Sequence, residues 1–113
     1  MGNRAQVKIE PMGLYFYTHW HGYHMPLLVR DALAKQWRWN EPSYLARIIF
    51  DSITAGTHEE ENGVRINTKF MDEDHPTIVV NTELQTVAWK GGACWSFEEY
   101  ALLDDDNPFF YDY

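Results

Sequence analysis

The sequence predicts an α+β fold in which two helices cover one face of a mostly antiparallel four-stranded sheet. Apolar residues recur every three or four positions between residues 26 and 55, which is typical of amphipathic helices. After residue 64 they alternate with polar residues, which is typical of strands. Three such strands follow one another, which favours hairpins over crossover helices. We therefore expect the order β-α-α-β-β-β-α in a single domain over residues 1–113.

Size and cysteine content suit one domain of a reducing compartment. The chain has 113 residues, of which 45% are apolar and 16% aromatic, so it can bury a core without disulfides. Its single cysteine, Cys94, allows no internal bridge. The first ten residues resemble no secretory signal, and no apolar run approaches the roughly 20 residues that cross a bilayer. We expect a cytoplasmic protein without membrane association.

The net charge of -8 is unevenly distributed along the chain. Residues 1–57 carry six Lys or Arg and four Asp or Glu, whereas residues 58–113 carry three and thirteen. An acidic half repels phosphate backbones and so argues against direct nucleic-acid binding. It suits a well-solvated surface or contact with a basic partner protein.

The first half of the chain is predicted as a strand and two helices. Residues 1–12 look like a polar lead-in with a brief extended piece at 7–9. Residues 13–18 carry aromatics on both faces, which indicates a central strand. Gly22 permits a turn, and Pro26 suits the first turn of a helix that we expect to reach Trp39.

Four-residue spacing predicts which faces of the helices are buried. In the first helix, Val29, Leu33 and Trp37 form the expected apolar stripe. Asn40 can end this helix and cap the second, which should span residues 41–55. The expected buried residues of the second helix are Leu45, Ile48, Ile49 and Ile53.

The second half is predicted to be strands that are followed by a short helix. Strands are expected at 64–70, 77–81 and 86–90, with a turn at 82–85. Ser96 and Glu99 have the spacing of a capping box, which predicts a helix over residues 97–103. Residues 104–113 form a tail that is rich in both aspartate and aromatic residues.

The turn contains a histidine motif. Thr18-His19-Trp20-His21-Gly22-Tyr23-His24 resembles the Thr-His-x-His-x-Asp-His motif of the metallo-β-lactamase family, with Tyr23 in place of the aspartate. The resemblance implies zinc bound by His19, His21 and His24 in a small metal-dependent hydrolase. That family has a longer fold and takes further ligands from later loops. The alternative is that these side chains are half-buried packing around a turn.

A second resemblance carries no activity. His19-Trp20, Gly22-Tyr23 and Tyr44-Leu45-Ala46 are similar to a pattern in small uncharacterised proteins of bacteria and their phages, which have a His-Trp-x-Gly-Tyr turn. It implies a bacterial or phage origin and no particular function. Apart from the zinc alternative, we expect no cofactor.

The acidic and aromatic second half gives our leading functional hypothesis. Aromatic residues anchor protein interfaces, and carboxylates steer basic partners. The hypothesis is a non-catalytic protein-binding protein that acts as an inhibitor or accessory factor. In the alternative, the tail aromatics fold back on the core or seal a homodimer. The candidate binding residues are Asp72, Glu73, Asp74, Asp104, Asp105, Asp106, Phe109, Phe110 and Tyr111.

Overall fold

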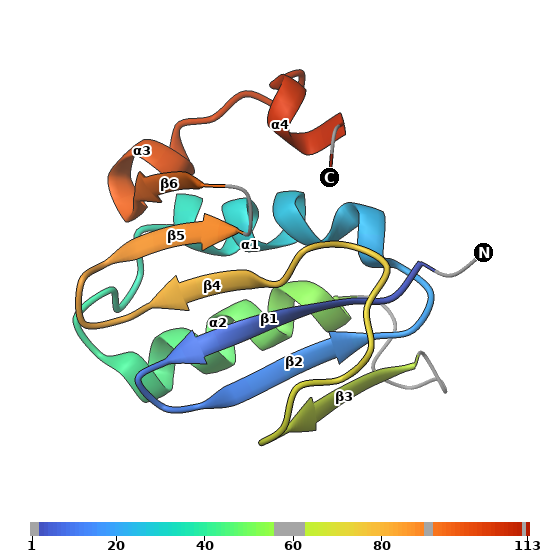
Figure 1. The fold of residues 1–113 in the computed structure, drawn as a ribbon. Helices are drawn as coiled ribbons and strands as arrows, with labels where there is room; N and C mark the ends of the chain where they lie inside the picture. Colours follow the sequence, from blue (N-terminus) through green and yellow to red (C-terminus); the bar gives the residue numbers. More distant parts are fainter. Residues whose placement is uncertain (1–2, 56–62, 90–91, 112) are drawn as a thin grey trace.

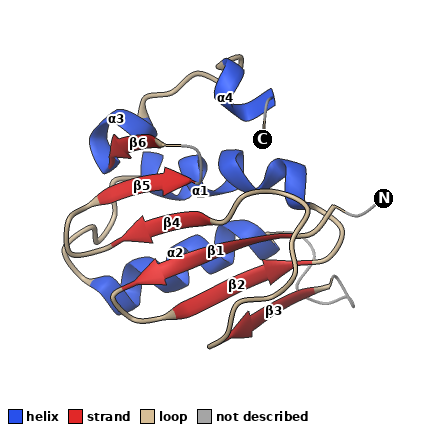
Figure 2. Ribbon diagram, viewed as in Figure 1, coloured by secondary structure: helices blue, strands red, loops and turns tan. Residues whose placement is uncertain are grey.

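The computed structural model describes residues 3–55, 63–89, 92–111 and 113. This part of the chain forms a six-stranded sheet and four α-helices (Figure 1, Figure 2). In chain order, the elements are β1 (Ala5–Glu10), β2 (Leu14–Thr18), a 3-10 turn η1 (Gly22–His24), α1 (Met25–Ala34), α2 (Pro42–Thr54), β3 (Val64–Asn67), β4 (Ile78–Asn81), β5 (Thr86–Trp89), β6 (Ala93–Ser96), α3 (Phe97–Ala101) and α4 (Pro108–Tyr111).

The sheet has the strand order β3-β2-β1-β4-β5-β6. Every neighbouring pair is antiparallel except β1 and β4, which are parallel. Helices α1 and α2 contact each other and lie behind the sheet in Figure 1, where they cover one face. The predicted α+β class is confirmed, but the predicted four-stranded sheet lacked β1 and β6.

Strand β1 lies at the centre of the sheet, so the prediction of a polar lead-in over residues 1–12 was wrong. Ala5, Val7 and Ile9 are fully buried against the helices. The alternate residue Gln6 is fully buried on the opposite face. Its polar side chain resembled a surface residue because the partners of its amide lie about 65 positions later in the chain.

Helix α1 is shorter than predicted, whereas α2 is within one residue of the prediction at both ends. Helix α1 ends at Ala34, and the backbone of Gln36 and of Arg38 then adopts positive φ angles of 58° and 59°. Trp37 consequently leaves the expected apolar stripe and is 57% exposed. The buried residues predicted for α2 are confirmed: Leu45, Ile48, Ile49 and Ile53.

The predicted strands of the second half exist, and the first of them is shorter than expected. Strand β3 ends at Asn67, and Phe70 beyond it is exposed. The capping box is confirmed, because Ser96 accepts a hydrogen bond from the Glu99 backbone while the Glu99 side chain accepts one from the Ser96 backbone.

Residues 68–77 connect β3 to β4 by crossing the sheet face that the helices leave open (Figure 1). We call them the crossing segment. The Gln6 side chain binds the backbone of Met71 twice: Gln6 Nε2 donates to the carbonyl at 2.9 Å, and Gln6 Oε1 accepts from the amide at 3.2 Å. A buried glutamine thus does for this segment what a neighbouring strand would do.

Replacing Gln6 with leucine should cost about 1–3 kcal/mol of unfolding free energy, because both backbone groups of Met71 lose their partner. Chemical denaturation measures the change. Lys69→Leu, at an exposed position of the same segment, is the control and should change stability by less than about 0.5 kcal/mol. Equal stability of the two variants would contradict the role of Gln6.

Candidate functional site

The turn between β2 and α1 presents large side chains to solvent. Gly22 is buried, and its N–H donates to the backbone oxygen of Asn3 at 2.8 Å. A Cβ at Gly22 would lie 2.3 Å from that oxygen and 2.8 Å from Cδ2 of His75. Only glycine allows this close approach. Trp20 and Tyr23, on either side of it, are each 53% exposed.

Asn3 holds the turn with its side-chain amide. Its Nδ2 donates to the backbone oxygen of Trp20 at 2.9 Å, and its Oδ1 accepts from the Tyr23 backbone N–H at 3.0 Å. The exposed position of Trp20 and Tyr23 is therefore fixed by hydrogen bonds to the backbone on both sides of Gly22.

The C-terminal segment packs beside this turn. Helix α4 contacts η1, and Phe110 is only 6% exposed. The ring of Phe110 lies 5.6 Å below the Arg30 guanidinium and makes an edge contact with Tyr100, which is itself buried. The expectation that the tail aromatics fold back on the core holds for Phe110.

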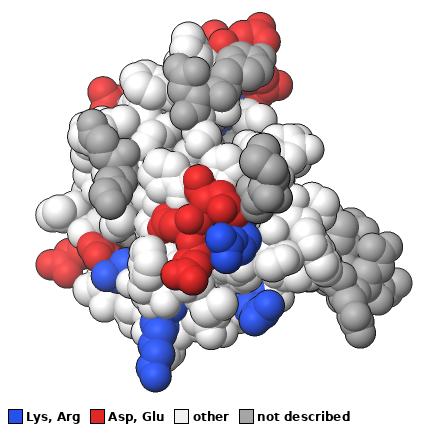
Figure 3. Space-filling model, turned by 45° about the vertical axis from the view of Figure 1, so that its right-hand side comes forward, with Lys and Arg blue, Asp and Glu red and all other residues white. Residues whose placement is uncertain are grey.

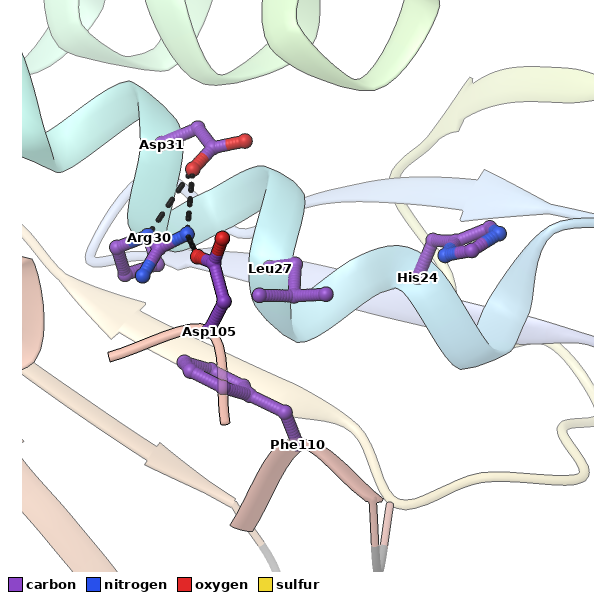
Figure 4. A pocket seen from close by; sticks show the side chains of 6 residues that line it. All are labelled: His24, Leu27, Arg30, Asp31, Asp105 and Phe110. Carbon is purple, nitrogen blue, oxygen red and sulfur yellow. Dashed lines mark hydrogen bonds and ion pairs between the residues drawn. The ribbon is translucent and has the colours of Figure 1, made fainter. Parts of the chain in front are cut away.

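A pocket opens between α1 and the C-terminal segment (Figure 4). Asp105 and Phe110 form one wall of the pocket. The other wall comes from the first turns of α1 and the residue that precedes it: His24, Leu27, Arg30 and Asp31. The ring centroids of His24 and Tyr23 are 4.0 Å apart, so the exposed surface of the turn is continuous with the pocket. We call Tyr23 and the six lining residues the turn–tail surface.

Arg30 is the fixed charge of this pocket. Its Nε donates to Asp31 Oδ1 at 3.0 Å, and its other nitrogens donate to the Leu103 carbonyl and to Asp105. Burial lowers the pKa of Arg30, but the hydrogen bonds to Asp105 and Asp31 outweigh it and the net shift is upward. The guanidinium therefore stays charged and ties the C-terminal segment to α1.

The carboxylates around Arg30 remain open to solvent. The side chains of Asp31 and Asp105 are 55% and 80% exposed, and Asp104 is exposed beside them. Figure 3 shows an acidic group at the top of the molecule, where the C-terminal segment lies. These carboxylates, next to the apolar side chains of Leu27 and Phe110, suit a ligand that is basic and partly apolar.

The structure does not bring the three candidate zinc ligands together. His19 Nδ1 lies 3.0 Å from the hydroxyl of Tyr17, His24 lines the pocket, and His21 is exposed. In the part of the chain that the structure describes, no group of three His, Cys, Asp or Glu residues is placed to hold a metal ion. The zinc-dependent alternative stays a prediction. His58, which could supply a further ligand from a later loop, lies outside the described residues.

Two of the three candidate acids in the crossing segment have partners within the protein. Glu73 accepts hydrogen bonds from Gln6 Nε2 and Thr77 Oγ1. Asp74 accepts from the backbone N–H of Arg4 at 2.8 Å and from its Nε at 3.1 Å. Asp72 is exposed. Figure 3 shows acidic and basic side chains gathered together in the middle of this face. The role of these acids in binding stays a prediction.

The candidate residues of the tail are placed in different surroundings. Asp104 and Asp106 are exposed, and Asp105 lines the pocket. Phe109 is 47% exposed and makes an edge contact with Trp95, away from the pocket. The side chain of Tyr111 lies outside the described part.

Sequence reasoning missed the contribution of α1 to this surface. Arg30 and Asp31 follow Leu27 by three and four positions, and His24 precedes Leu27 by three, so all four share one side of the helix. This spacing is visible in the sequence, but our prediction of a buried face named only the stripe of Val29, Leu33 and Trp37.

Comparison with known proteins shows no relative: no family, curated protein or solved structure matches this chain. Among the described residues, no helix combines the length and apolarity that spanning a membrane requires. The function therefore has to be argued from the site itself.

Replacing Gly22 with alanine should displace Asn3, because the new Cβ would lie 2.3 Å from its backbone oxygen. We expect a loss of about 1–3 kcal/mol in unfolding free energy and large shifts of the Tyr23 amide resonance. Gly13→Ala is the control, since a Cβ there meets nothing within 4 Å. It also has a positive φ, so it should lose some stability but leave the Tyr23 resonance in place.

Asp74 should titrate well below a free aspartate. Its hydrogen bonds with Arg4 lower its pKa from 3.8 to about 2. Because the folded pKa is the lower one, the carboxylate stabilises the fold above pH 3.8 and loses this effect as the pH falls towards 2. Wild type should therefore be more stable than Asp74→Asn at pH 6, and the difference should shrink as the pH falls from 3.8 through about 2. A pH-independent difference in denaturation midpoints would refute this.

Proposed function

We propose that this protein is a non-catalytic binding protein whose turn–tail surface receives a basic segment of another protein. The observation that supports the proposal is the pocket itself. It places exposed carboxylates of Asp31 and Asp105 beside the apolar side chains of Leu27 and Phe110, next to an exposed Tyr23. By binding another protein through this surface, the protein would act as an inhibitor or accessory factor. We place it in the cytoplasm, with which its single free cysteine is consistent.

The carboxylates and the aromatic side chains of this surface contribute to binding in different ways. Carboxylates speed the encounter with a positively charged partner, and this effect weakens as salt screens the charges. Aromatic side chains that become buried supply much of the affinity in protein interfaces. Tyr23 can do so at low entropic cost, because Asn3 and Gly22 already fix the backbone beneath it.

Quantitative capture of partner proteins from bacterial lysate, compared between variants, tests whether the turn–tail surface binds them. We expect Tyr23→Ala to weaken capture about tenfold or more, since it removes an exposed tyrosine that would become buried on binding. Asp31→Lys should weaken it as well, and added salt should do the same to wild type. Tyr44→Ala is the control, because Tyr44 is an exposed tyrosine on α2, outside the turn–tail surface. Equal capture by all variants would remove this surface from the proposal.

A further inference from the structure

His75 connects three parts of the chain that are far apart in sequence. Its Nδ1 lies 2.7 Å from the backbone oxygen of Tyr113, and its Nε2 lies 2.7 Å from Oδ1 of Asn3. Its ring stacks on the ring of Tyr113 with 4.8 Å between centroids and 8° between planes. The imidazole thus holds the C-terminal end on one side and the anchor of the turn on the other.

Both oxygens can only accept hydrogen bonds. The backbone oxygen of Tyr113, the last residue of the printed sequence, has no hydrogen to donate, and an ionised terminal carboxylate has none either. The amide of Asn3 is oriented by its other two contacts, because Nδ2 donates to the Trp20 carbonyl and Oδ1 accepts from the Tyr23 N–H. Turning this amide over would set oxygen against oxygen and N–H against N–H, so Oδ1 is the atom that faces His75.

Two accepting oxygens require two N–H groups on the ring. A neutral imidazole carries one N–H, and only the imidazolium carries two. We propose that protonated His75 holds the turn and the C-terminal segment together, so that the turn–tail surface depends on pH. We call this pair of hydrogen bonds the fastener. When the ring loses one proton, it keeps either Asn3 or Tyr113 and releases the other.

Several charged or titratable groups surround the fastener. Asp74 precedes His75 and is held ionised mainly by Arg4; the charge of His75 adds to this and also lowers the pKa of Asp74. Tyr113 donates its hydroxyl to the Pro76 carbonyl, and burial followed by the nearby charge of Glu73 raises its pKa, so it stays neutral. On the turn side, the ring faces the neutral Asn3 and Gly22.

The direction of the pH effect follows from these contacts. The arrangement with both hydrogen bonds contains one more proton than the arrangement with one of them. It is therefore favoured at low pH and is lost as the pH rises. The pocket lies between the two segments that His75 holds, so loss of either hydrogen bond loosens one wall of the pocket. A consequence for partner binding rests on the proposed function.

The test on wild-type protein uses ring-nitrogen NMR of His75 between about pH 5 and pH 8. We expect both ring nitrogens to carry a proton at the lower end. As the ring titrates, the amide resonances of Tyr23 or Tyr113 should move with the same midpoint. A ring that is neutral over the whole range would overturn the inference, as would titration that leaves both amides unmoved.

Variants separate the fastener from the binding function. His75→Ala should abolish the movement of the Tyr23 and Tyr113 amides at the midpoint recorded for the His75 ring, whereas the exposed control His21→Ala should retain it. Movement retained at that midpoint in His75→Ala would contradict the inference. The NMR measurement involves no partner, so failure of the capture experiment leaves it standing and refutes only the binding function. If His75→Ala does not fold, the wild-type titration alone decides.

Discussion

The buried amide of Gln6 is the contact on which the arrangement of this protein depends. It lets a strand with one polar face occupy the centre of the sheet, because the backbone of Met71 satisfies that amide on the open face. This hydrogen bonding holds the crossing segment over β1, so that the segment covers the open face of this strand. Its last residues then reach the beginning of β1, where Asp74 binds Arg4 and His75 binds Asn3.

This chain of contacts continues into the turn–tail surface. Asn3 binds the backbone of the turn, and His75 also binds Tyr113, which follows the short helix that contains Phe110. Arg30 then fastens that segment to α1 through Asp105 and the Leu103 carbonyl. No single element forms the pocket; its two walls come from α1 and the C-terminal segment, and Arg30 joins them through Asp105.

What could be predicted from the sequence was local. The extent of α2, the hairpin of β4 and β5 and the capping box at Ser96 follow from spacing within a few residues. Strand β1 could not be recognised, because a buried Gln6 looks like a surface residue until its distant partner is known. The turn was recognised as a candidate site by its residue types. Its contact with the C-terminal segment was not, since a separation of more than 80 residues leaves no spacing signal.

The structure also changes where the negative charge can act. Counting acids along the sequence gives the crossing segment the same weight as the C-terminal segment. Yet Asp74 is neutralised by Arg4, and Glu73 is occupied by hydrogen bonds on the sheet. Around the pocket, Asp31 and Asp105 share Arg30, whose side chain is largely covered, and Asp104 is exposed. Under the proposed function, a basic partner would be drawn to the C-terminal end of the molecule, where Asp31 and Asp105 line the pocket beside the apolar side chains of Leu27 and Phe110.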